Sequence, residues 1–457
     1  MYNHIQKFLF STAFVIAAAV CHSQSIPEKL TQAYQRFESD SQLRVATTSL
    51  YVIDAKTGKV LFEKNADVGL ATASTLKVIT AATAYELLGK DFRYTTKFGY
   101  TGKIKSRILN GDLYIKPSGD PTLGSWRWKQ TSDTAVLEKI STAFKKLNIS
   151  SYNQFVIDNK GWNDETIPDG WIWQDVGNYY GAGASGFNWR ENQYDIVLRS
   201  GSAVGDSVKI AGTKPEKVPF TLSSLATTAA KGTGDNAYVY YPLLSSHGII
   251  RGTIPVNENA FTISASIPDP QKFFLSGVKM NSHQVRSTSA STDTTILVTH
   301  FSPPLDSIVY WFLKRSINLY GEALTKTFAF QKKGIGATDD GVEITRMFWK
   351  EKDIDPAELN IVDGSGLSPL NRVTTHAQVQ VLAYAKKQPW FGDYFEAFPV
   401  FNDMKMKSGT IRGVKGFCGY QKARDGNEYI FSFLVNNYVG SASSVVQKMY
   451  KVLDILK

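Results

Sequence analysis

The sequence predicts a multi-domain α/β protein in which one α/β domain is split by a long insertion. Strand-type segments near the N-terminus (residues 46–63) and near the C-terminus (residues 405–435) have apolar patterns that allow them to share one sheet. Between them, roughly 200 residues from Tyr94 to Asp293 have short β-type runs broken by Gly, Pro and Asn turns. A chain of 457 residues is long enough for two or three domains.

The split domain begins with residues 25–93, for which we expect two helices and a hairpin. Its elements, in order, are an amphipathic helix at 27–37, strands at 46–54 and 59–63 joined across Lys56-Thr57-Gly58, and a helix that ends near Leu88. The second helix is expected to bury one apolar stripe, formed by Val78, Ile79, Ala82, Tyr85 and Leu88.

The insertion is expected to contain two units. Residues 94–190 and 267–292 form an inserted α+β domain, and residues 191–266, with Thr, Val and Ile between Gly/Pro turns, form a small β-rich domain within it. The main elements of the larger unit are a helix at 135–147, a strand at 155–158, an aromatic loop at 171–189 and a helix at 270–280. Such an insertion should leave and re-enter the first domain at an exposed edge.

Residues 293–457 return to a regular α/β pattern and complete the split domain. The expected elements are a strand at 296–300, helices at 305–314, 316–329, 343–350 and 375–387, strands at 405–410 and 429–435, and a last helix with Val445, Met449, Val452 and Leu456 on one side.

The N-terminus has the features of a secretory signal peptide, which we assign to residues 1–24. Lys7 precedes an apolar run at residues 8–20, and small or polar residues follow. The run is too short to cross a membrane and no later segment approaches a span, so we expect an exported, periplasmic or wall-associated protein. A lipoprotein anchored through Cys21 is less favoured, because Val20 is a poor residue before a lipidated cysteine.

Charge and composition exclude several classes of function. The hydrophobic content of 43% and charged content of 20% are those of a globular protein, with a formal net charge of +10. The basic residues are scattered without a nucleic-acid motif, so we expect no nucleic-acid partner and at most a mild attraction to anionic surfaces. The six histidines show no ligand spacing, so no metal or organic cofactor is expected.

The tetrad Ser74-Thr75-Leu76-Lys77 is the first candidate for catalysis. A serine and a lysine three positions apart lie on one helix face, about one turn from each other. Lys77 can take the proton of the Ser74 hydroxyl if a second cation and a dry site keep its amine neutral. Taken alone, the pattern is better explained by a helix-capping serine and an unrelated surface lysine.

Two further motifs follow in a fixed order. Ser316-Ile317-Asn318 would relay a proton towards the leaving amine and position the substrate amide and Lys77; alone it is better explained as a polar helix face. Lys407-Ser408-Gly409-Thr410 reads as a strand. The alternative there is an edge-strand lysine before a tight turn.

The four residues of the strand motif have separate expected roles. Lys407 supplies positive potential, and the hydroxyls of Ser408 and Thr410 hold a carboxylate. Gly409 lets a substrate backbone lie close. The backbone amides of Ser74 and Thr410 are expected to form an oxyanion hole.

The three motifs together match the S-x-x-K, S-x-N and K-[TS]-G set of the serine penicillin-recognising enzymes. Ser316 follows Ser74 by 242 positions, and this long gap resembles the D-alanyl-D-alanine carboxypeptidase/endopeptidase family, peptidase S13, the low-molecular-mass class C penicillin-binding proteins. The likeness covers about residues 49–439. Further segments that carry it are Ser118-Gly119-Asp120-Pro121, Trp171-Ile172-Trp173-Gln174-Asp175, Asn178-Tyr179-Tyr180, Glu191-Asn192 and Asp363-Gly364-Ser365-Gly366-Leu367-Ser368.

The resemblance implies a transpeptidase/β-lactamase-like catalytic domain, peptidoglycan stem peptides as substrates and β-lactam antibiotics as covalent inhibitors. It also implies that Asp175 recognises the free amino end of a diaminopimelate side chain, and that Asp363 and Ser365 support the active-site wall. Glu358-Leu359-Asn360 resembles the deacylating loop of class A β-lactamases, but it precedes a strand-turn pattern and is interpreted as incidental.

We therefore expect an exported serine DD-peptidase that acts through an acyl-enzyme at Ser74, with carboxypeptidase and endopeptidase action. Two alternatives stay open: a β-lactamase on the same scaffold, and a non-catalytic peptidoglycan-binding protein. The intact motifs argue against the second alternative.

Overall fold

A computed structural model describes residues 24–242, 245–278 and 294–457. The predicted signal peptide and Cys21 therefore lie outside the described residues, apart from Gln24. Within the described ranges, the helices are too short or too polar to cross a bilayer. Cys418 is a free, buried cysteine.

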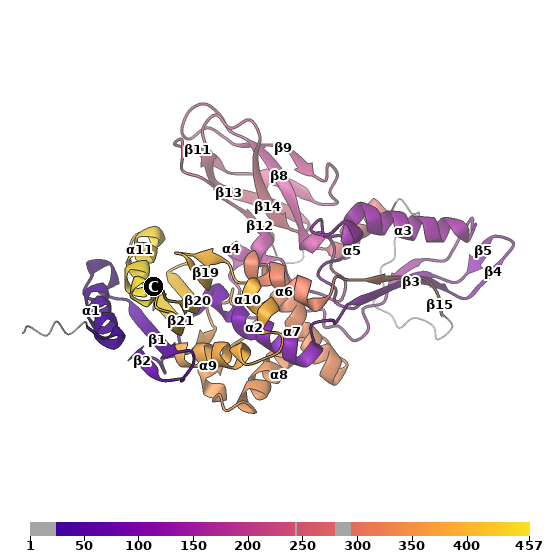
Figure 1. The fold of residues 1–457 in the computed structure, drawn as a ribbon. Coiled ribbons are helices and arrows are strands. Elements are labelled where there is room, and N and C mark those ends of the chain that lie inside the picture. The colour runs from indigo at the N-terminus through magenta and orange to yellow at the C-terminus, as the bar shows by residue number, and fades with distance from the viewer. Residues whose placement is uncertain (1–23, 243–244, 279–293) are drawn as a thin grey trace, which may run out of the picture.

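A six-stranded sheet joins the two ends of the chain (Figure 1). β1 pairs antiparallel with β21 along its whole length, from Thr47 opposite Asn436 to Asp54 opposite Tyr429. The prediction that the N-terminal hairpin and the C-terminal strands share one sheet is therefore confirmed. The strand order is β18 (Val400–Phe401), β19 (Met404–Ile411), β20 (Val414–Lys422), β21 (Glu428–Asn436), β1 (Thr47–Asp54) and β2 (Val60–Lys64).

Helices cover both faces of this sheet. On one face, α1 (Ile26–Glu38) and α11 (Ala442–Leu453) pack on alternate residues of the central strands, such as Phe431 and Phe433. Six helices and the other face of the sheet share a second core (Figure 1). The helices are α2 (Lys77–Leu88), α6 (Leu305–Lys314), α7 (Asn318–Lys333), α8 (Thr338–Lys350), α9 (Thr375–Lys386) and α10 (Phe391–Glu396).

Helix α2 is buried on all sides over its first nine residues, Lys77 to Tyr85, and not only along the expected apolar stripe. The reason is its position, since α6, α7 and α9 all contact it. A helix enclosed in this way loses its polar face. The lysine at its first position is consequently removed from water.

The insertion forms a second sheet, in the order β15 (Thr294–Phe301), β3 (Thr95–Thr101), β6 (Leu113–Lys116) and β7 (Phe155–Ile157). The remaining elements of this unit are β4 (Lys103–Lys105), β5 (Ile108–Asn110), α3 (Asp133–Lys146) and α5 (Pro270–Gly277). We expected the strand at 296–300 in the catalytic domain, but β15 pairs with β3 from end to end. The chain therefore returns to the first domain near residue 302 and not at residue 293.

The β-rich part of the insertion contains two small sheets. The first has the order β14 (Phe261–Ser266), β8 (Gln193–Arg199) and β9 (Lys209–Lys214). In the second, β13 (His247–Pro255) pairs with β10 (Thr221–Ser224), β11 (Thr227–Ala229) and β12 (Asn236–Tyr240). Apolar residues of these sheets and of the larger unit belong to one continuous core, which includes Phe98, Ile196 and Ile254.

The two chain crossings between the first domain and the insertion lie side by side. The Tyr94 amide donates to the Ser302 hydroxyl at 2.9 Å, and the Ser302 amide donates to the Tyr94 carbonyl at 3.0 Å. Both residues are buried, so the crossing lies in the interior and not at the exposed edge that we expected. Because the two crossings lie together, the long insertion does not interrupt the six-stranded sheet.

Candidate active site

Ser74 lies on a 3₁₀ turn, Ala73–Leu76, that leads directly into α2. Lys77 is the first residue of that helix, and its Nζ lies 2.9 Å from the Ser74 Oγ. The sequence-predicted placement on one face of a helical segment is thus what the structure shows. A hydroxyl at the start of a helix also meets the positive end of the helix dipole, which favours negative charge on its oxygen.

The Lys77 amine makes two further hydrogen bonds, to the Asn318 Oδ1 at 2.6 Å and to the Ser365 carbonyl oxygen at 2.7 Å. Burial lowers the pKa of Lys77 well below its ordinary value. The neighbouring charge of Lys407 lowers that pKa further, and the carboxyl groups of Asp363 and Glu322 oppose the shift. A neutral amine in this position can accept the serine proton.

The second motif departs from the expected helix. Ser316 lies in the link between α6 and α7 with a φ of 57°, and α7 begins only at Asn318. A left-handed backbone at a residue with a side chain is strained, and such strain is concentrated at functional sites. The Asn318 Nδ2 donates to the Tyr180 carbonyl at 2.7 Å, so the side chain is held from both ends.

The third motif lies on β19. The Lys407 Nζ is 3.0 Å from the Ser316 Oγ and 2.7 Å from the Ser408 carbonyl oxygen. Burial lowers the pKa of Lys407 to about 7. Beyond it, the exposed Thr410 accepts a hydrogen bond from Lys415 at 2.7 Å. The three sequence motifs therefore meet through two direct contacts, Lys77 with Asn318 and Lys407 with Ser316.

Gly409 allows a close backbone approach within the protein itself. A Cβ at this position would lie 2.5 Å from the Thr72 carbonyl oxygen and 3.0 Å from the Ser74 amide nitrogen. The missing side chain thus lets β19 pack against the turn that carries the serine. The backbone that approaches Gly409 is the protein's own.

A pocket of about 990 Å³ opens above these residues and is lined by Ser74, Ser316, Asn318 and Thr410. Asp175, on the short helix α4 (Trp173–Val176) of the insertion, lines the same pocket. Burial raises the pKa of Asp175, and a hydrogen bond with the Tyr180 side chain opposes the shift. The rest of the lining mixes aliphatic residues with aromatic and basic ones, and the aromatic and basic residues include Trp126, Arg127, Tyr179, Tyr180, Tyr238, Arg315 and Arg412.

The wall behind Lys77 is a loop held by the buried carboxylate of Asp363. This carboxylate accepts hydrogen bonds from the amides of Gly366 and Ser368, from the side-chain nitrogen of Asn371 and from the Trp171 indole. Four donors on one carboxylate fix the loop that presents the Ser365 carbonyl to Lys77. Trp171 also ties the insertion to this wall.

Several residues at the site were not predicted from the sequence. The Tyr180 and Ser365 carbonyl oxygens are backbone groups, which no side-chain pattern reveals. Glu322 is fully buried, and its Oε2 accepts a hydrogen bond from the Gly364 amide at 3.1 Å. The sequence did contain one signal for Glu322: it follows Asn318 by four positions, which places both side chains on one face of a helix.

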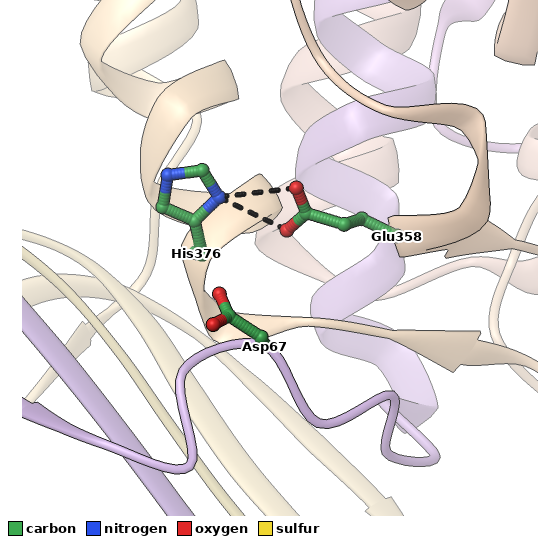
Figure 2. Close-up of side chains that lie close together, drawn as sticks. All are labelled: Asp67, Glu358 and His376. Atoms are coloured by element: carbon green, nitrogen blue, oxygen red, sulfur yellow. Dashed lines mark hydrogen bonds and ion pairs between the residues drawn. The ribbon is translucent and has the colours of Figure 1, made fainter.

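Glu358 does not line the pocket; it pairs with His376, whose Nδ1 lies 2.9 Å from the Glu358 Oε2 (Figure 2). Asp67 lies beside them. Each of the three residues has one atom that could bind a metal ion, and these three atoms lie within 4.8 Å of one another. These three groups could hold a divalent cation, but they lie outside the pocket lining. The interpretation of Glu358 as incidental to deacylation agrees with this position.

The sequence matches the D-Ala-D-Ala carboxypeptidase 3 (S13) family over residues 30–454. The chain belongs to this family. The predicted family and the prediction of a serine peptidase are thereby confirmed. Two curated relatives support the assignment: a D-alanyl-D-alanine carboxypeptidase of Actinomadura sp. (strain R39) and a D-alanyl-D-alanine carboxypeptidase DacB of Haemophilus influenzae.

The relatives of this S13 peptidase are distant but match it over most of their length. The Actinomadura protein is 25% identical over 445 residues, covering 89% of this chain and 81% of its own. The Haemophilus protein is 22% identical over 409 residues, covering 83% of each. The crystal structure of penicillin binding protein 4 from Haemophilus influenzae superposes with a TM-score of 0.79 at 19% identity, over 94% of this chain and 99% of that one. This superposition confirms the predicted fold class.

Proposed function

We propose that the protein is an exported serine DD-peptidase that cleaves D-alanyl-D-alanine ends and D-alanyl cross-links of peptidoglycan through an acyl-enzyme at Ser74. The observation that carries this proposal is the contact of the Ser74 hydroxyl with a buried lysine whose pKa is lowered. This pairing has no evident structural purpose, because an amine buried for stability alone would be costly.

In acylation, the Lys77 amine takes the Ser74 proton as the serine oxygen attacks the carbonyl between two D-alanines. Negative charge develops on the carbonyl oxygen, for which the amides of Ser74 and Thr410 are our proposed donors. Ser316, hydrogen-bonded to Lys407, then gives its proton to the leaving amine and receives the proton that Lys77 took from Ser74. Lys77 is therefore neutral again when the bond to the second D-alanine has broken.

Deacylation reverses the roles of the same groups. Water attacks the acyl-enzyme and transfers a proton through Lys77, and the Ser74 hydroxyl is restored. Before cleavage, the terminal carboxylate of the intact peptide is held by the Lys407 charge together with the Ser408 and Thr410 hydroxyls.

Asp175 is the proposed anchor for the free amino group of a diaminopimelate side chain. Its carboxylate is half-buried at the pocket wall, where an ammonium group would pair with it in a poorly hydrated setting. A pocket of about 990 Å³ has room for more than a dipeptide, which supports action on cross-linked peptides as well as on free ends.

Export and domain organisation belong to the same proposal. A peptidoglycan substrate lies outside the cytoplasm, so the signal peptide at residues 1–24 is consistent with it. We further propose the catalytic domain as residues 25–93 with about 302–457, the inserted domain as 94–190 with 267–301, and the β-rich domain as 191–266.

The decisive test is covalent labelling by a fluorescent penicillin. We expect one labelled site in the mature protein, and we expect the label to be absent in Ser74→Ala. A second measurement, mass spectrometry of muropeptides incubated with the protein, shows whether peptides are cleaved. The Haemophilus penicillin binding protein 4 fold has been solved in complex with a β-lactam, which supports the choice of probe. A folded wild-type protein that stays unlabelled would contradict the proposal.

The same assays separate the two alternatives. A β-lactamase would turn over a chromogenic cephalosporin rapidly and would not keep a long-lived adduct. A non-catalytic wall-binding protein would retain muropeptides without releasing D-alanine. Release of D-alanine from a pentapeptide, together with a stable penicillin adduct, supports the peptidase.

A further inference from the structure

Glu322 is a buried acidic residue next to the catalytic lysine that the proposed mechanism does not use. It follows Asn318 by four residues on α7, so the two side chains lie on the same helix face. Its side chain is fully buried. The Oε2 accepts the Gly364 amide, and the Oε1 has no hydrogen-bond partner in the described part of the chain.

The two-residue segment Gly364-Ser365 connects Glu322 to Lys77. The Gly364 amide donates to Glu322 at 3.1 Å, and the carbonyl of the next residue, Ser365, accepts from the Lys77 Nζ at 2.7 Å. On its other side, the Gly364 carbonyl accepts from the Thr80 hydroxyl at 2.7 Å. The segment is therefore held between α7 and α2 by three hydrogen bonds.

Space around this peptide is tight. A Cβ added to Gly364 would lie 2.4 Å from the Gly321 carbonyl oxygen. The missing side chain at Gly364 lets the loop lie against α7, where its amide reaches Glu322. The position of the Ser365 carbonyl, and with it one of the three contacts of the Lys77 amine, thus depends on Glu322 together with Asp363.

Charged groups face Glu322 from each element around it. They are Lys77 on α2, Asp363 on the wall loop and Lys326 on α7 itself. The Lys326 Nζ donates to the Glu165 carbonyl, and Lys407 on β19 faces Lys77. Burial and the charge of Asp363 raise the pKa of Glu322 to about 8. At neutral pH its carboxyl is therefore mostly protonated.

We propose that Glu322 is a positioning residue for Lys77, which holds the Ser365 carbonyl against the lysine amine. The inference rests on the proposed function, because it requires Lys77 to act as the base.

The test compares Glu322→Gln with Glu322→Ala, using Glu343→Gln as a control on the exposed face of α8. The glutamine keeps an acceptor for the Gly364 amide but cannot ionise. The measurement is the second-order rate constant for acylation by a fluorescent penicillin from pH 6 to pH 10, with the melting temperature recorded at each pH.

We expect the rate constant of Glu322→Gln to stay within about twofold of the wild type, because its side-chain oxygen still accepts the Gly364 amide, and that of Glu322→Ala to fall about tenfold. Glu322→Ala should be slower than Glu322→Gln at every pH, and Glu343→Gln should match the wild type.

Acylation of Glu322→Ala at the wild-type rate would overturn the inference. It would also be overturned if both Glu322 variants lost the same activity at every pH, since that result indicates a structural role only. A wild-type protein that is not acylated at any pH would instead refute the proposed function itself, and the two failures are thereby distinguished.

Discussion

The Asn318 side chain bridges the Lys77 amine and the Tyr180 carbonyl, at 2.6 Å and 2.7 Å respectively. Lys77 belongs to the first domain and Tyr180 to the insertion, so one amide group couples the two walls of the pocket. Because Oδ1 accepts and Nδ2 donates, the side chain can satisfy both partners in only one orientation.

Replacing Asn318 should therefore affect the base directly. In Asn318→Ala we expect acylation by penicillin to slow by about five- to 150-fold, as for the loss of a buried hydrogen bond worth roughly 1–3 kcal/mol. Asn318→Asp should be slower still, because a carboxylate beside Lys77 raises its pKa and favours the charged amine. Stopped-flow labelling measures both effects, and acylation of Asn318→Ala at the wild-type rate would contradict the prediction.

The affinity for substrates that end in a carboxylate should depend on pH through Lys407. Its pKa is lowered to about 7, so the side chain is cationic below pH 7 and neutral above it. We expect KM for a D-alanyl-D-alanine peptide to rise about tenfold from pH 6 to pH 8, the change for one group with that pKa. In Lys407→Met, KM should be high and independent of pH; a variant that keeps the wild-type pH dependence would show that another group causes it.

Gly409→Ala should disturb the turn that carries Ser74. The added methyl would meet the Thr72 carbonyl oxygen at 2.5 Å, so either the strand or the turn must move. We expect a loss of about 1–3 kcal/mol in the free energy of unfolding together with slower acylation. The control is Gly392→Ala on α10, where a Cβ meets no atom within 4 Å and stability should be retained or increased.

Asp175→Asn should reduce discrimination between side chains with and without a free amino group. We expect kcat/KM for a peptide with a free side-chain amine to fall about tenfold, as for the loss of a partly buried charge pair. The same peptide with an acetylated amine should lose much less. Equal losses for the two peptides, measured by release of D-alanine, would remove Asp175 from the recognition of the amine.

Glu358→Gln should leave the lifetime of the penicillin adduct unchanged, because Glu358 pairs with His376 outside the pocket lining. Mass spectrometry of the adduct over time measures the lifetime, and Asn318→Ala, which removes a contact of Lys77, shows in parallel that the assay detects changes at the site. A longer-lived adduct in Glu358→Gln would mean that this carboxylate takes part in deacylation.

The helices and the central sheet could be predicted from local patterns. The period of apolar residues gave α6 with its observed ends and α9 to within one residue. The third motif and the long apolar run at residues 429–435 gave β19 and β21 to within one residue at each end. The pairing of β15 could not be predicted this way, because a strand's partner depends on which edge is free in the folded insertion. Ser316 was expected on a helix, since its left-handed backbone leaves no signal in composition.

The sequence by itself determined the family and the three motifs, because the identity and order of Ser74, Ser316 and Lys407 need no coordinates to be recognised. Only the tertiary structure decided that Lys77 is enclosed on all sides, that Gly409 faces the protein's own backbone and that Glu322 stands behind the base. Burial and the spacing of charges set the pKa of an amine, and both depend on segments that lie hundreds of residues apart in the chain.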